Sequence, residues 1–180
     1  MSANSLPRRA AVTGALGAAA AVAAPALAEA APGVDDRTAV QLVVDGIDNA
    51  VDDKDWARCR RYFTDQVDVD FAALDGGPPA RIPADELVGA WRRNLYAEKA
   101  SFHSRTNHEI TIRGDRATVR SKGYAFNRLR RPLGDDLWEV WAYYAHELVK
   151  TPEGWRCRAI AISEVLHSRG NELARTHVPS

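Results

Sequence analysis

Two short segments of the sequence contain residues that could perform acid–base chemistry. One is the acidic run that begins at Asp52 and ends at Trp56, and the other is Phe102-His103. A fold that brings a carboxylate to an imidazole creates a group that can take up and return a proton near neutral pH. Each residue also has a structural interpretation, because Asp52 could cap a helix and His103 could be a hydrogen-bonded histidine at a strand edge. The catalytic interpretation predicts a small-molecule enzyme.

The rest of the composition argues against several other functions. The chain has 24 basic and 24 acidic residues, so no charge excess favours nucleic acid as a partner. Glycine-rich phosphate loops and nucleophile elbows are missing from the sequence. We therefore expect chemistry that needs no cofactor and no metal. The remaining histidines show no spacing typical of metal ligands: His108, His146, His167 and His177.

Apolar residues at helical spacing predict three helices before residue 100. The first should run from a cap at Asp36 to about Asp52, and the second should follow a cap at Asp53 or Asp55. The third should have Pro83 in its first turn. Their buried faces would be formed by Val40, Val43, Val44, Ile47 and Val51, by Trp56, Cys59, Tyr62 and Phe63, and by Leu87, Val88, Trp91 and Leu95.

Alternating residues predict strands, which dominate after residue 100. A first strand is expected at 66–71, before a loop at 76–79. Two hairpins should follow, with strands 109–113 and 116–126 around Gly114-Asp115 and strands 138–150 and 155–166 around 152–154. This order predicts a cone-shaped α+β barrel, in which three N-terminal helices pack in a curved antiparallel sheet. A pocket is expected between the concave face of the sheet and the helices.

The first thirty residues have the composition of a secretory signal peptide. Arg8-Arg9 precedes an uncharged, alanine-rich stretch over 10–28, which ends in small residues suited to cleavage. The paired arginines favour the twin-arginine route, which predicts a secreted protein. The alanine-rich stretch is too short for stable membrane insertion after processing. Residues 31–168 would form the folded domain, and the tail 169–180 would either cover the pocket mouth or lie disordered.

Cys59 and Cys157 are the only cysteines. Disulfides form in exported proteins, so the two residues could pair if the fold brings them together. Both also lie in apolar segments, which favours two buried free thiols. The sequence leaves these alternatives open.

Several motifs together resemble the scytalone dehydratase branch of the SnoaL-like, or nuclear transport factor two-like, superfamily. They are Asp52 to Trp56, Asp70-Phe71 and the segment 82–89, followed by Phe102-His103, Gly114-Asp115 and 144–156. The resemblance covers most of the chain after the leader, and it implies a cone-shaped fold with a ligand pocket. Fold alone does not define the reaction, because this superfold carries dehydratases, cyclases, isomerases, epoxide hydrolases and non-catalytic proteins.

The resemblance also implies roles for individual residues. Asp52 and His103 fall on the positions of the family's catalytic aspartate–histidine pair, and Asn127 and Tyr144 would orient a substrate oxygen. Asn127 replaces a second histidine of the dehydratase, and an asparagine cannot act as an acid. Two tyrosines of that enzyme are also replaced, here by Val51 and Phe71. The walls of the cavity would include Val51, Phe71, Leu74, Trp91 and Ile162.

These departures favour chemistry that needs fewer polar groups than scytalone dehydration. We expect a cofactor-independent dehydratase or other lyase, isomerase or cyclase that acts on a hydrophobic oxygenated small molecule, such as a polyketide, an aromatic compound or a terpenoid. The alternative is a secreted, non-catalytic domain that binds a small ligand or associates with itself. Relatives of this fold often pair through the exposed sheet face, so a homodimer or homotrimer is a further expectation.

Overall fold

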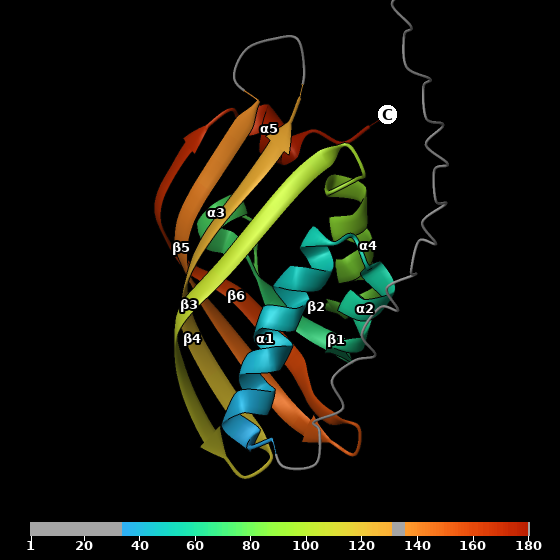
Figure 1. Ribbon diagram of the computed structural model, residues 1–180, viewed down its shortest axis with the longest axis vertical. Coiled ribbons are helices and arrows are strands. Elements are labelled where there is room, and N and C mark those ends of the chain that lie inside the picture. The colour runs from blue at the N-terminus through green and yellow to red at the C-terminus, as the bar shows by residue number, and fades with distance from the viewer. Residues whose placement is uncertain (1–33, 131–135, 180) are drawn as a thin grey trace, which may run out of the picture.

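One long helix lies across the concave face of a single curved sheet, and the shorter helices lie toward the C-terminal end of that helix (Figure 1). The computed structural model describes residues 34–130 and 136–179, so the predicted leader and its cleavage site lie outside the described residues. Within these ranges no helix has the length and apolar character needed to cross a membrane. The elements are α1 (Asp36–Asp52), α2 (Trp56–Arg61), β1 (Phe63–Asp70), α3 (Ala72–Asp75), β2 (Ala80–Pro83), α4 (Ala84–Asn94), β3 (Lys99–Arg113), β4 (Arg116–Leu129), β5 (Leu137–Thr151), β6 (Gly154–Gly170) and α5 (Glu172–Thr176).

The sheet has the strand order β2-β1-β6-β5-β4-β3. Four of its pairings are antiparallel, and the α+β cone with helices packed in a curved sheet is confirmed. The pairing of β1 with β6 is parallel, which differs from the expected antiparallel sheet. Parallel neighbours need a long connection, and here the chain forms four other strands between β1 and β6. The two hairpins account for most of the concave face.

The ends of the helices differ from the predictions by one or two residues. Asp35 caps α1, because its carboxylate accepts a hydrogen bond from the Thr38 backbone nitrogen at 3.0 Å. The expectation that Asp36 is the cap is wrong, because its carboxylate lies 2.7 Å from the Lys150 ammonium instead. For α2, the cap is Asp55, one of the two expected residues. Pro83 immediately precedes α4, as the last residue of β2, and does not lie in the first helical turn.

Strand β3 begins ten residues before the predicted strand at 109–113. The early part of β3 directs Ser101, His103 and Arg105 toward α1, where they contact acidic side chains. A strand whose inner face is polar lacks the apolar alternation on which the prediction relied. The missed segment is therefore the one that carries the polar residues of the site.

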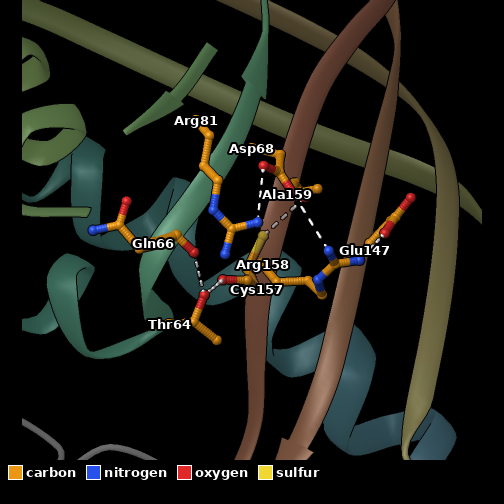
Figure 2. Close-up of polar contacts among 8 residues, drawn as sticks. All are labelled: Thr64, Gln66, Asp68, Arg81, Glu147, Cys157, Arg158 and Ala159. Atoms are coloured by element: carbon orange, nitrogen blue, oxygen red, sulfur yellow. Dashed lines mark hydrogen bonds and ion pairs between the residues drawn. The ribbon is translucent and has the colours of Figure 1, made fainter. Parts of the chain in front are cut away.

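The junction of β1 and β6 contains a register shift between Phe63 and Asp68. Here the Thr64 hydroxyl donates to the Gln66 carbonyl at 2.7 Å and also lies 3.4 Å from the Cys157 carbonyl (Figure 2). On the outer side, Asp68 lies between Arg81 and Arg158, each 3.4 Å away. Asp68 is thus held by one arginine of β2 and one of β6.

The two cysteines are buried free thiols. Burial raises the pKa of both Cys59 and Cys157 to about 12. A thiol with so high a pKa stays protonated at neutral pH, so neither cysteine is a reactive nucleophile. Around them, α1 packs against the inner face of the sheet in a core that includes Val40, Val44, Ile47, Ala117, Val119, Leu148 and Trp155.

Candidate active site

A cavity of about 570 Å³ lies between the inner face of the sheet and the helices α1, α3, α4 and α5. His103 lines this cavity, whereas Asp52 lies behind His103, away from the lining. The wall also contains residues that the sequence did not indicate, among them Asp48, Arg105, Trp138 and Arg175. The remaining residues predicted for the site all line the cavity, and they are Val51, Phe71, Leu74, Trp91, Asn127, Tyr144 and Ile162.

Asp52, the last residue of α1, holds His103 through two hydrogen bonds. Its Oδ1 lies 2.8 Å from Nδ1 of the imidazole, and its Oδ2 accepts from the His103 backbone nitrogen at 2.6 Å. Both side chains are mostly buried, with 18% of Asp52 and 19% of His103 exposed. The pair therefore has one fixed geometry at the edge of the cavity.

The ionisation state of Asp52 determines which nitrogen of the His103 imidazole carries the hydrogen. Burial by itself would raise the pKa of Asp52, but the hydrogen bonds and charge of His103 outweigh it and lower this pKa below its ordinary value. An ionised carboxylate only accepts hydrogen bonds, so Nδ1 carries the hydrogen of the neutral imidazole. Nε2 then has the lone pair, and it has no hydrogen-bond partner among the described residues. His103 can therefore act as a base toward a molecule in the cavity.

A second ion pair lies one helical turn before the first. Asp48 of α1 contacts Arg105 of β3, with Arg105 Nε 2.7 Å from Oδ2 and Arg105 Nη2 3.0 Å from Oδ1. Only 10% of the Asp48 side chain and 5% of the Arg105 side chain are exposed. Burial alone would lower the pKa of Arg105, but Asp48 and Tyr144 raise it, so the guanidinium stays charged. This buried pair fixes α1 against β3 beside the catalytic candidate.

Arg105 also covers one face of Tyr144. The guanidinium carbon lies 3.3 Å from the centroid of the Tyr144 ring. Gly123 leaves the space for this stack, since a Cβ there would lie 2.4 Å from Tyr144 Cε2 and 2.5 Å from Arg105 Nη1. Tyr144 is thus part of the cavity wall and of the Arg105 stack, and any contact with a ligand must use the part of the tyrosine that Arg105 leaves uncovered.

Replacing Gly123 by Ala is expected to lower the free energy of unfolding by about 1–3 kcal/mol, because the added methyl overpacks the Arg105–Tyr144 stack. Chemical denaturation measures the effect. Gly77→Ala is the matched control, because a Cβ at Gly77 would meet no described atom within 4 Å. Equal stabilities of the two variants would show that the close approach at Gly123 is not a constraint.

Asn127 presents an amide to the cavity from β4. The residue is 9% exposed, and its side chain makes no hydrogen bond to the described part of the chain. A buried amide without a protein partner is favourable only if water or a ligand satisfies it. Its NH₂ group can donate to a ligand oxygen in the same cavity that His103 faces.

The C-terminal segment closes one end of the cavity. Arg175 and Thr176 of α5 lie in the wall, and the buried Lys99 ammonium donates to the carbonyls of Arg175 and His177 at 2.9 and 2.8 Å. Burial lowers the pKa of Lys99 to about 8. Within the described residues, two residues of the predicted tail thus contribute to the cavity wall.

Metal ligands do not gather anywhere in the described ranges: no group of three His, Cys, Asp or Glu side chains is placed to hold an ion. Cofactor-independent chemistry remains a prediction from the sequence.

Comparison with known proteins shows the family to which this chain is similar. The SnoaL-like domain family matches the sequence over residues 32–161. The Kfla4162 protein from Kribbella flavida is 30% identical and has a TM-score of 0.73, with coverage of 78% of this chain and 97% of that one. A search of curated protein sequences gives no match.

Two structures of lower identity share the fold. A candidate scytalone dehydratase from Novosphingobium aromaticivorans is 15% identical with a TM-score of 0.64, and the match covers 80% of this chain and 89% of that one. A type 2 hexachlorocyclohexane dehydrochlorinase is 13% identical with a TM-score of 0.60, and the match covers 74% and 86%. The family match spans more than half of the chain and agrees with the observed cone. The chain therefore belongs to the SnoaL-like domain family of the nuclear transport factor two-like superfamily.

Proposed function

We propose that the protein is a cofactor-independent acid–base enzyme, in which His103 is the general base and acid and Asp52 is its partner. The observation that carries this proposal is His103 Nε2, which has no hydrogen-bond partner in the described part of the chain and lies at the wall of an otherwise largely apolar cavity, with Nδ1 held 2.8 Å from the Asp52 carboxylate. In this proposal the enzyme is a lyase, an isomerase or a cyclase. The leader predicted from the sequence extends the proposal to a secreted enzyme.

The proposed chemistry uses two of the polar groups in the cavity wall, His103 and Asn127. His103 Nε2 removes a proton from a carbon next to a carbonyl, and the C–H electrons move toward the carbonyl oxygen. The Asn127 amide donates a hydrogen bond to that oxygen as its negative charge develops. Asp52 stabilises the imidazolium, which then delivers the proton to a departing hydroxyl or to another carbon. The first outcome eliminates water, and the second moves a double bond.

The cavity favours an uncharged substrate. Its two arginines already have carboxylate partners, Arg105 with Asp48 and Arg175 with Glu172 at 2.8 Å. A charged ligand would lose its water of hydration without gaining an unpaired counter-ion. Phe71, Trp91 and other apolar side chains form much of the wall, which suits a hydrophobic oxygenated ring. The names of the two less similar structures, a dehydratase and a dehydrochlorinase, denote eliminations and support the same class.

Extracts of the producing cells provide a test in which the substrate does not have to be identified beforehand. The purified wild type should convert at least one metabolite, detected by mass spectrometry, and Asp52→Asn and His103→Gln should not. Asp53→Asn is the matched control, because Asp53 is 63% exposed and pairs with Arg58 outside the cavity. Identical product profiles for all four proteins would contradict the enzymatic proposal and leave ligand binding.

A synthetic probe tests the base separately from the natural substrate. The apolar, uncharged compound 5-nitrobenzisoxazole opens when a base removes its single C–H proton on the five-membered ring. The C–H electrons form a nitrile, the N–O bond breaks, and the oxygen leaves as a coloured phenolate. The reaction requires only a base in an apolar site, which is what His103 would supply.

A further inference from the structure

Lys54 has an unusual backbone conformation at the end of α1. Its φ is +59°, in the left-handed region that favours glycine. The Asp55 backbone nitrogen donates to the Ala50 carbonyl at 2.9 Å, and the Lys54 nitrogen donates to the Val51 carbonyl at 3.1 Å. These two bonds define a Schellman motif, whose left-handed position is usually occupied by glycine. A lysine at this position makes the backbone less stable than a glycine would. The presence of the lysine side chain therefore needs another explanation.

Two hydrogen bonds connect the Lys54 side chain to the Asp52 carboxylate by way of the Ser101 hydroxyl. Its ammonium donates to Ser101 Oγ at 2.7 Å, and Ser101 Oγ donates to Asp52 Oδ1 at 2.9 Å. The direction of both bonds is fixed, because an ammonium only donates and a carboxylate only accepts. The single hydroxyl hydrogen of Ser101 must therefore lie toward Asp52. All three side chains are partly buried, which limits competition from water.

This relay completes the set of donors around Asp52. Oδ1 accepts from Ser101 and from His103 Nδ1, and Oδ2 accepts from the His103 backbone. Burial raises the pKa of Asp52, and the contributions of His103, followed by the Ser101 hydrogen bond, lower it. Burial lowers the pKa of Lys54, and the charge of Asp52 opposes that effect, so the two groups interact electrostatically. Lys99 lies close enough to Lys54 for the two ammonium charges to repel each other.

We propose that Lys54 and Ser101 are positioning residues that hold the Asp52 carboxylate in the orientation His103 needs for proton transfer. The proposal rests on the acid–base function proposed above. Neither residue lies in the cavity wall, so they act through Asp52 and do not contact the substrate. The relay keeps Asp52 ionised and stationary while the proton moves to and from His103 Nε2. The strained backbone at Lys54 is retained because it directs the ammonium at Ser101.

Lys54→Gly separates this role from a structural one. Glycine relieves the left-handed backbone, so the melting temperature of the full chain should stay the same or rise. The pKa of Asp52, followed by ¹³C NMR of labelled aspartate carboxyls, should rise by about one unit, a tenfold change in its proton affinity. With 5-nitrobenzisoxazole, kcat should fall about tenfold to a hundredfold, because misorientation of a catalytic group slows the chemical step, while KM should not change.

Two further variants complete the test. Ser101→Ala should also raise the pKa of Asp52. Lys54→Arg should have a pKa of Asp52 and a kcat closer to those of the wild type than Lys54→Gly has, because arginine keeps the cationic donor. An unchanged pKa of Asp52 in Lys54→Gly overturns the proposal, as does a lower melting temperature with kcat and KM both unchanged. If the wild type opens the probe no faster than His103→Gln, the acid–base function fails instead. The NMR comparison then still decides whether Lys54 acts on Asp52.

Discussion

Replacing His103 by Gln is expected to slow the opening of 5-nitrobenzisoxazole by about 10²–10⁴-fold, the usual contribution of a general base. Glutamine is similar in size and keeps the backbone hydrogen bond to Asp52, but its amide cannot take up a proton at neutral pH. The loss should therefore appear in kcat, with little change in KM or in the folded structure. The absorbance of the phenolate product measures the rate directly.

The control for this prediction is the same substitution at a histidine outside the cavity. His167 is exposed on the outer face of the sheet, where its ring packs against Trp141 at a centroid distance of 5.5 Å. His167→Gln should retain the wild-type rate. If both variants lose the same fraction of activity, the effect comes from a general disturbance of the fold and not from removal of the base.

Asp48→Ala is expected to cause the largest loss of stability, about 3–5 kcal/mol in the free energy of unfolding, because it leaves Arg105 buried without its partner. The guanidinium is 5% exposed and cannot recover its hydration without moving out of the stack with Tyr144. Unfolding in urea at neutral pH, with the slope checked to be unchanged, measures this loss.

Two comparisons show whether the unpaired charge is the cause. The double variant Asp48→Ala, Arg105→Met removes both charges and should recover much of the stability, because replacing a whole buried pair is far less costly than breaking it. Glu109→Ala removes one partner of an exposed pair with Arg120, whose charged atoms lie 3.8 Å apart, and should change stability by about 0–1 kcal/mol. An Asp48→Ala variant no less stable than Glu109→Ala would contradict the structural role of the Asp48–Arg105 pair.

Much of the fold could be predicted because its signals are local. The apolar spacing of α1, the cap at Asp55 and the turns at Gly114 and Gly154 each depend on a few neighbouring residues. The parallel pairing of β1 with β6 was missed, because it joins segments distant in the sequence and no local pattern encodes it. Choosing Asp35 over Asp36 as the cap depends on the tertiary contacts of Asp36 with Lys150 and Trp155.

The candidate site was predictable where the family resemblance supplied positions. It placed His103 and Asn127 at the same cavity, and the structure brings Asp52 to His103. The resemblance did not identify Arg105. The alternation of apolar residues did not reveal this part of β3 either, because its inner face is polar. One signal was present: Asp48 lies on the buried side of α1, where an acid needs a cationic partner.

The pH dependence of 5-nitrobenzisoxazole opening, measured for the wild type and for His103→Gln over the same range, is the most direct test of the acid–base role of His103. A general base works only when it is unprotonated, so the wild-type kcat/KM should rise with pH in one step and then level off. The variant should lack that step and show only the slow background reaction with hydroxide. The same step in His103→Gln, or no step in the wild type, would show that His103 is not the base.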